Sequence, residues 1–119
     1  MSEFNNVLDF WFGPAASEGY GRARDAWFRK DPGFDARIRA EFLDLYERAD
    51  AGQCDAWGEE PDSALALAVV LDQFPRNMFR GTPRSFASDG RALAVARNAL
   101  ARDFDRGLLP VQRWFIYLP

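Results

Sequence analysis

The fold is decided by residues 64–83, which read ALALAVVLDQFPRNMFRGTP. The first part of this stretch, residues 64–71, contains only Ala, Leu and Val. By composition it fits either a buried strand or a buried helix. We predict a helix, because Ala and Leu are strong helix formers and the apolar register continues to Phe74. Pro75 is then expected to stop or bend this helix, since proline lacks the backbone N–H that a helix interior needs.

Polar side chains cluster at the end of the predicted helix. Five of them need hydrogen-bond partners: Asp72, Gln73, Arg76, Asn77 and Arg80. A buried polar group without a partner costs about 1–3 kcal/mol, so the cluster must be paired internally or must face a ligand or water. If helical turns resume after Pro75, residues 72, 76 and 80 share one side of the helix, and Asp72 forms an ion pair with Arg76.

The rest of the chain also shows helical patterns. We expect further helices at residues 5–12, 24–28, about 35–50, 84–86, 89–102 and from Pro110 onwards. No alternating strand pattern and no hairpin signal accompanies them. Consecutive helices with short loops predict an all-α fold of stacked antiparallel helical hairpins, in which no clean sequence repeat is found. The length of 119 residues fits a single domain over residues 1–119.

Composition and charge exclude several functional classes. The chain has no histidine, which excludes Ser-His-Asp catalysis and histidine-ligated zinc. Its single cysteine excludes an internal disulfide. The net charge of −3, with basic and acidic residues interleaved, weighs against nucleic acid as a partner. No Rossmann or Walker glycine pattern occurs, and no cofactor or metal site is predicted.

The sequence also indicates a cellular location. No apolar run reaches the roughly 18 residues that cross a bilayer, so no membrane association is expected. The first residues, MSEFNN, have no basic segment and no small-residue cleavage site, so no signal peptide is expected. The predicted location is the cytoplasm.

Several motifs, in order along the chain, resemble those of one bacterial family. They are VLDFWFG at 7–13, WF at 27–28, FD at 34–35, LDQFPRNMFRGTP at 71–83 and FIYLP at 115–119. On these motifs the chain resembles the family of domain of unknown function 924. The resemblance implies an all-helical fold similar to tetratricopeptide-like right-handed superhelices, and no established activity. It also implies that family members continue past Pro119 into a His-Ser-Glu stretch, so that this chain corresponds to the N-terminal two-thirds of the family domain.

The polar cluster leaves three hypotheses open. In the first, it is a structural lock that ties a bent helix to the next hairpin. In the second, the domain is an interaction module that binds a protein segment or a small anionic ligand, with Arg76 and Arg80 on the acidic group and Gln73 and Asn77 orienting it. In the third, the protein is an enzyme that acts on a small anionic metabolite, with Asp72 as acid/base.

The last residues, VQRWFIYLP at 111–119, are strongly apolar and aromatic. No later element of this sequence is there to cover them. A large exposed apolar patch indicates a partner surface, so we expect self-association or partner binding through this segment.

Overall fold

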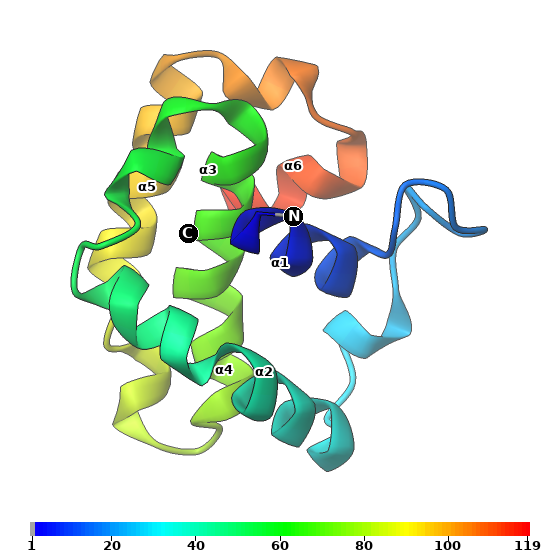
Figure 1. Cartoon of the computed structure of the whole chain (residues 1–119), viewed down its shortest axis with the longest axis vertical. Coiled ribbons are helices and arrows are strands. Elements are labelled where there is room, and N and C mark those ends of the chain that lie inside the picture. Colours follow the sequence, from blue (N-terminus) through cyan, green and yellow to red (C-terminus); the bar gives the residue numbers. More distant parts are fainter. Residues whose placement is uncertain (1) are drawn as a thin grey trace.

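The computed structural model describes residues 2–119 and shows only helices joined by turns and loops (Figure 1). The α-helices are α1 (Glu3–Phe12), α2 (Pro32–Asp50), α3 (Pro61–Ala68), α4 (Phe74–Met78), α5 (Asp89–Ala101) and α6 (Pro110–Tyr117). Short 3₁₀ turns are η1 (Asp25–Trp27), η2 (Asp55–Glu59), η4 (Pro83–Phe86) and η5 (Phe104–Gly107), and η3 (Val69–Gln73) is a π-helix. The all-α prediction is confirmed. The superhelical detail stays a prediction.

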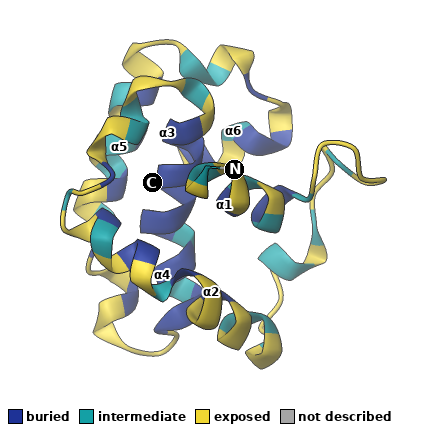
Figure 2. Cartoon of the chain, viewed as in Figure 1, coloured by how far each residue is buried: buried dark blue, intermediate teal, exposed yellow. Residues whose placement is uncertain are grey.

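The segment α3–η3–α4 is one helical rod through the middle of the molecule (Figure 1). Helices α1, α5 and α6 pack on α3, and α2 packs on α4. Every residue of the rod from Ser63 to Asp72 is buried, which gives α3 the deepest colour in Figure 2. The Ala/Leu/Val run is therefore a core helix, as its composition predicts.

Aromatic side chains fill the space between α1 and the other helices. Trp11 lies in edge contact with Phe74 of α4, at 5.8 Å between ring centroids, and with Phe115 of α6, at 5.6 Å. The indole N–H of Trp27 and the guanidinium of Arg24 donate to the carbonyl of Trp11, at 2.9 and 2.7 Å. These bonds satisfy a carbonyl at the end of α1 and hold η1 against that helix.

Several helix starts differ from the predicted ones by one to three residues, and two of them show a physical reason. Helix α2 begins at Pro32 rather than near residue 35, because Asp31 caps it by accepting the backbone N–H groups of Gly33 and Phe34 at 3.0 and 3.2 Å. The next short helix, η4, begins at Pro83 rather than at residue 84, and the hydroxyl of Thr82 before it donates to the carbonyl of Phe79 and does not cap the helix.

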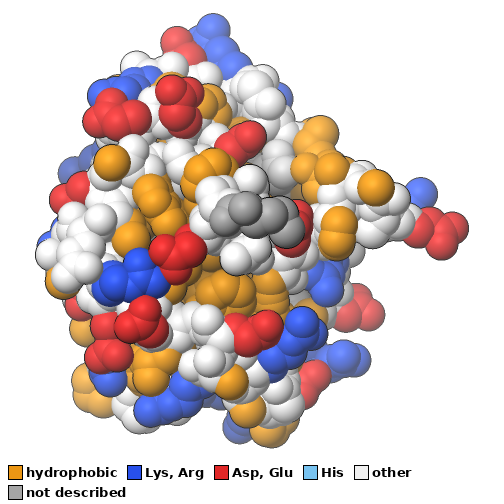
Figure 3. Space-filling view, viewed as in Figure 1, with side chains coloured by type: hydrophobic (Ala, Val, Ile, Leu, Met, Phe, Trp, Pro, Cys, Tyr) orange, Lys and Arg blue, Asp and Glu red, His pale blue; other side chains and the backbone are white. Residues whose placement is uncertain are grey.

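The surface mixes charges of both signs. Figure 3 shows basic and acidic side chains interleaved over one face of the molecule. Within residues 2–119, no helix combines the length and hydrophobicity that crossing a bilayer requires.

Candidate functional site

The predicted stop at Pro75 is a widened turn inside a continuous helical rod. The N–H of Phe74 donates to the carbonyl of Val69, which is a bond of the π type between residues five apart. Helix α4 then continues through Pro75 as its second residue. Of the two outcomes expected at Pro75, a stop or a bend, the stop is wrong, because the helix continues into α4 and the π-turn accommodates the proline ring. Such turns often occur at functional sites.

The carbonyl of Leu71 would bond to residue 75 in a regular α-helix, but Pro75 has no N–H to donate. Instead, the hydroxyl of Ser88 donates to this carbonyl at 2.7 Å, and the Tyr46 hydroxyl donates to Ser88 at 3.1 Å. All three groups are buried. The side chains of α2 and of the turn before α5 therefore satisfy the backbone group that the proline leaves free.

The five predicted polar residues divide into two groups. The first group, which we call the Asp35 lock, consists of Asp35, Asn77 and Arg80. Asn77 donates to Oδ1 of Asp35 at 2.8 Å, and Arg80 donates to both carboxylate oxygens at 2.8 and 3.1 Å. Burial alone would raise the pKa of Asp35, but the hydrogen bonds from Arg80 and Asn77 outweigh it and lower that pKa. This group ties the segment after the π-turn to the preceding helix α2, whereas the first hypothesis ties it to the next hairpin.

The second group, which we call the Asp72 cluster, consists of Asp72, Gln73, Arg76 and Asp89. Asp72 is only 6% exposed. Its Oδ2 accepts from the Gln73 amide at 2.7 Å, while its Oδ1 lies 3.4 Å from Nη2 of Arg76. The predicted Asp72–Arg76 ion pair is therefore present, although its distance is long. Burial raises the pKa of Asp72 despite the opposing effects of Arg76 and Gln73.

Arg76 connects the Asp72 cluster to the turn that follows α4. Its Nη1 donates to the carbonyl of Ser85 at 2.6 Å and to Oδ1 of Asp89 at 2.9 Å. Its guanidinium also lies over the ring of Phe86, at 4.6 Å from the centroid. One side chain therefore holds η4 and the start of α5 against α4.

A cavity of about 250 Å³ opens beside the Asp72 cluster. Its charged lining residues, which we call its charged wall, are Asp72, Arg76 and Asp89, and its uncharged ones are Gly90, Leu93, Leu118 and Pro119. These residues come from η3, α4, α5 and the two positions that follow α6. Gly90 is exposed, and a Cβ atom placed on it would meet no atom within 4 Å, so a side chain can be added at this edge of the cavity.

A second hollow, of about 590 Å³, is also lined by Arg76, together with Arg80 and residues 81–83, 85 and 86. It corresponds to the predicted anion pocket. Both arginines already contact carboxylates, Arg76 through Asp72 and Asp89 and Arg80 through Asp35. This pairing weakens the attraction that either guanidinium offers to an added anion, and anion binding here stays a prediction.

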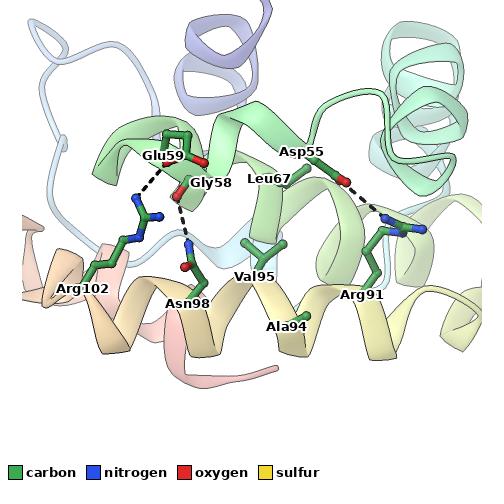
Figure 4. Close-up of a pocket in the computed structure, with 9 residues that line it drawn as sticks. All are labelled: Asp55, Gly58, Glu59, Leu67, Arg91, Ala94, Val95, Asn98 and Arg102. Carbon is green, nitrogen blue, oxygen red and sulfur yellow. Dashed lines mark hydrogen bonds and ion pairs between the residues drawn. The ribbon is translucent and has the colours of Figure 1, made fainter.

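A third hollow, of about 310 Å³, separates η2 from α5 (Figure 4). Polar contacts cross it along its length: Arg102 to Glu59 at 2.9 Å, Asn98 to the Gly58 carbonyl at 3.0 Å and Arg91 to Asp55 at 3.5 Å. Because each long side chain in it bridges the two elements, we assign this hollow a structural role.

The surface beside the 250 Å³ cavity carries large exposed apolar side chains. We call Phe28, Trp114 and Leu118 the apolar strip; they are 70%, 42% and 62% exposed. The rings of Phe28 and Trp114 lie 6.3 Å apart, Leu118 follows Trp114 by one helical turn, and Leu118 also lines the cavity. The expected exposure of the C-terminal segment is thus seen in part, since the other face of α6 is buried.

Sequence reasoning missed the acidic partners of the cluster. Asp35 lies 42 positions from Asn77, and Asp89 lies 13 positions from Arg76, so no local spacing connects them. One signal was available. Both aspartates occupy the first turn of a helix, where acidic side chains are common and where an arginine can reach them.

Comparison with known proteins identifies the family to which this chain belongs. The family described as a bacterial protein of unknown function, DUF924, matches residues 7–119. The chain belongs to the DUF924 family. A solved structure of a protein of unknown function from Agrobacterium tumefaciens is similar to it, with a TM-score of 0.86 and 37% sequence identity. The similarity covers 98% of this chain and 61% of that chain, and no curated protein matches this DUF924 chain.

Proposed function

We propose that this DUF924 domain is a cytoplasmic protein-interaction module that binds a segment of a partner protein along the apolar strip. The observation that carries the proposal is the continuity of the strip with the cavity. Phe28, Trp114 and Leu118 follow one another on the surface and end at a hollow with charged side chains in its wall. Exposed apolar patches with polar rims mark interaction surfaces.

The residue types of the strip suit this role. Aromatic side chains supply large contact areas and are enriched among the residues that dominate binding energy. The cavity adds a place where one side chain of the segment can be buried, and its few polar groups can fix the orientation. The sequence favoured an acidic group held by Arg76 and Arg80. Because aspartates already pair with both guanidinium groups, we place the contact on the strip and the cavity instead.

A peptide-display selection against the full chain tests the proposal. Selected peptides should bind the wild type, and Leu118→Asp should weaken them about tenfold or more, which corresponds to about 1.4 kcal/mol. Leu100 is a matched control, since it is also an exposed leucine, at 38%, and lies on α5 outside the strip. Binding is measured by fluorescence anisotropy. Peptides that bind Leu118→Asp as tightly as the wild type, or a selection that yields no binder, would refute the proposal.

A second copy of the chain is the competing occupant of the strip. Light scattering at high protein concentration distinguishes the two cases. A dimer that Leu118→Asp dissociates, while Leu100→Asp leaves it intact, would assign the strip to self-association.

A second candidate function is catalysis, with Asp72 as acid/base on a small anionic metabolite and Arg76 beside it. The observation that favours it is the raised pKa of a buried carboxyl group in a cavity wall. A metabolite screen for turnover tests it. Any activity that Asp72→Asn leaves unchanged does not use this carboxylate.

A further inference from the structure

The charged wall of the 250 Å³ cavity holds two carboxylates and one guanidinium. Oδ1 of Asp72 has only the long 3.4 Å contact with Arg76. Asp89 receives Arg76 through Oδ1 at 2.9 Å, and among residues 2–119 no donor reaches its Oδ2. The wall therefore offers more acceptor sites than donors, and its formal charge with both carboxylates ionised is negative.

Arg76 is poorly placed to correct this shortage. Its Nη1 is shared between Asp89 and the carbonyl of Ser85, and its Nη2 is far from ideal distance to Asp72. Water can supply the missing donors while the cavity is open. Leu118 belongs to both the apolar strip and the cavity lining, so a segment docked on the strip would reach the cavity and displace water from it. A carboxylate that is buried without a donor is strongly destabilising, so the segment must supply both positive charge and hydrogen-bond donors.

We infer that the cavity receives a lysine side chain of the bound segment, with its alkyl stem against Leu93 and Leu118. Arg76 already contacts Oδ1 of both Asp72 and Asp89, so the ammonium group is placed beside this guanidinium, on the carboxylate oxygens that it leaves least satisfied. An ammonium has three donors and no acceptor, which matches the oxygens left free on the wall. Its stem is apolar, which matches Leu93, Leu118 and Pro119 in the lining, and lysine commonly buries its stem in this way. The inference rests on the proposed function, because it names the anchor of the segment that the strip binds.

The experiment uses small probes that share one carbon skeleton. The ¹⁵N-labelled full chain is titrated with n-butylammonium, with butyrate and with butanol, and the amide resonances of Gly90 and Leu93 are followed. Butylammonium should produce saturable shifts at both residues, and the other two probes should not. Asp89→Asn should weaken butylammonium about fivefold or more.

A blocking variant and its control locate the binding. Gly90→Leu places a side chain at this exposed edge of the cavity and should abolish the butylammonium shifts at Leu93. Gly107→Leu is the matched control, because a Cβ at Gly107 also meets no atom within 4 Å and Gly107 does not line the cavity. That variant should bind butylammonium as the wild type does.

Several outcomes would overturn the inference. Binding of butyrate in place of butylammonium would show an anion pocket, and equal binding of butanol would show a purely apolar one. Selected peptides that bind the strip but tolerate replacement of every lysine would refute the lysine anchor while the proposed function stands. Butylammonium binding in the cavity together with a failed peptide selection would refute the proposed function and retain the cation site.

Discussion

The Asp35 lock and the Asp72 cluster are two versions of the same pairing. In each, an aspartate contacts an arginine of the segment after the π-turn; Arg76 lies on α4, and Arg80 lies four positions later, just beyond the end of that helix. Asp35 accepts hydrogen bonds of 2.8 to 3.1 Å on both oxygens, and its pKa is lowered. Asp72 has one short bond and one long one, and its pKa is raised. A carboxylate with all its donors stabilises the fold, whereas one that lacks donors beside a cavity is available to a ligand.

The largest effect is expected from Asp35→Ala. It leaves the buried amide of Asn77 and the guanidinium of Arg80 without their acceptor, and should lower the free energy of unfolding by about 2–3 kcal/mol in urea denaturation. Asp62→Ala is the control, since Asp62 also occupies the first turn of a helix but is exposed. It should cost less than about 1 kcal/mol. Equal losses of unfolding free energy in Asp35→Ala and Asp62→Ala would contradict the assignment of Asp35 as a lock.

Arg76→Ala should have an intermediate effect, about 1–2 kcal/mol, because it frees the Ser85 carbonyl and one oxygen of Asp89 but leaves Asp72 bonded to Gln73. It should also raise the pKa of Asp72 further, since the nearby positive charge is lost. Thermal unfolding measures the first effect and ¹³C NMR titration of the carboxyl group measures the second. A loss of stability as large as that of Asp35→Ala would mean that Arg76 serves mainly as a lock.

The stabilities of two amide variants, Asp35→Asn and Asp72→Asn, should change with pH in opposite directions relative to wild type. A lowered pKa means that Asp35 stabilises the fold above its unfolded pKa of about 3.9, and that this stabilisation is lost as pH falls through the lower folded value. A raised pKa means that the folded state holds the Asp72 proton more tightly than the unfolded state does. Protonation of Asp72 therefore stabilises the fold fully below about pH 3.9, and this stabilisation declines as pH rises through the folded pKa.

Asp35→Asn should therefore be less stable than wild type at pH 7, with a difference that shrinks towards pH 3. Asp72→Asn should lie within about 1 kcal/mol of wild type, with its relative stability increasing from pH 3 to pH 7. Chemical denaturation at a series of pH values tests both. The same sign of pH dependence in the two variants would contradict the comparison.

The smallest effect is expected from Gly90→Ala. The added methyl group enters open space at the second position of α5 and should stabilise the protein by about 0.5–1 kcal/mol through helix propensity. Calorimetry can resolve such a gain. A loss of stability would mean that other atoms pack closely against Gly90, as they do around Asp35 in the lock.

The sequence predicts the rod and the position of the polar cluster, because both depend on local composition. The Ala/Leu/Val run must be buried, and the five polar side chains after it must find partners. Their division into two groups depends on Asp35 and Asp89, which tertiary packing brings in from distant helices. The π-turn was missed for a similar reason. Pro75 indicates a helix stop unless a donor for the Leu71 carbonyl is known, and that donor, Ser88, lies 17 positions away.

The π-turn at Val69–Gln73 also sets how far α4 is rotated about the helix axis relative to α3. An α-helix advances about 100° per residue, so one extra residue in a turn rotates everything on one side of it relative to the other. Here α3 faces α1, α5 and α6, while α4 faces α2. Removal of one residue from this segment would restore the regular α-helical period. It would also rotate α4 relative to α3, so that the apolar faces of the two helices would no longer both point at their present neighbours. The insertion therefore lets a single rod serve two sets of neighbours that lie in different directions.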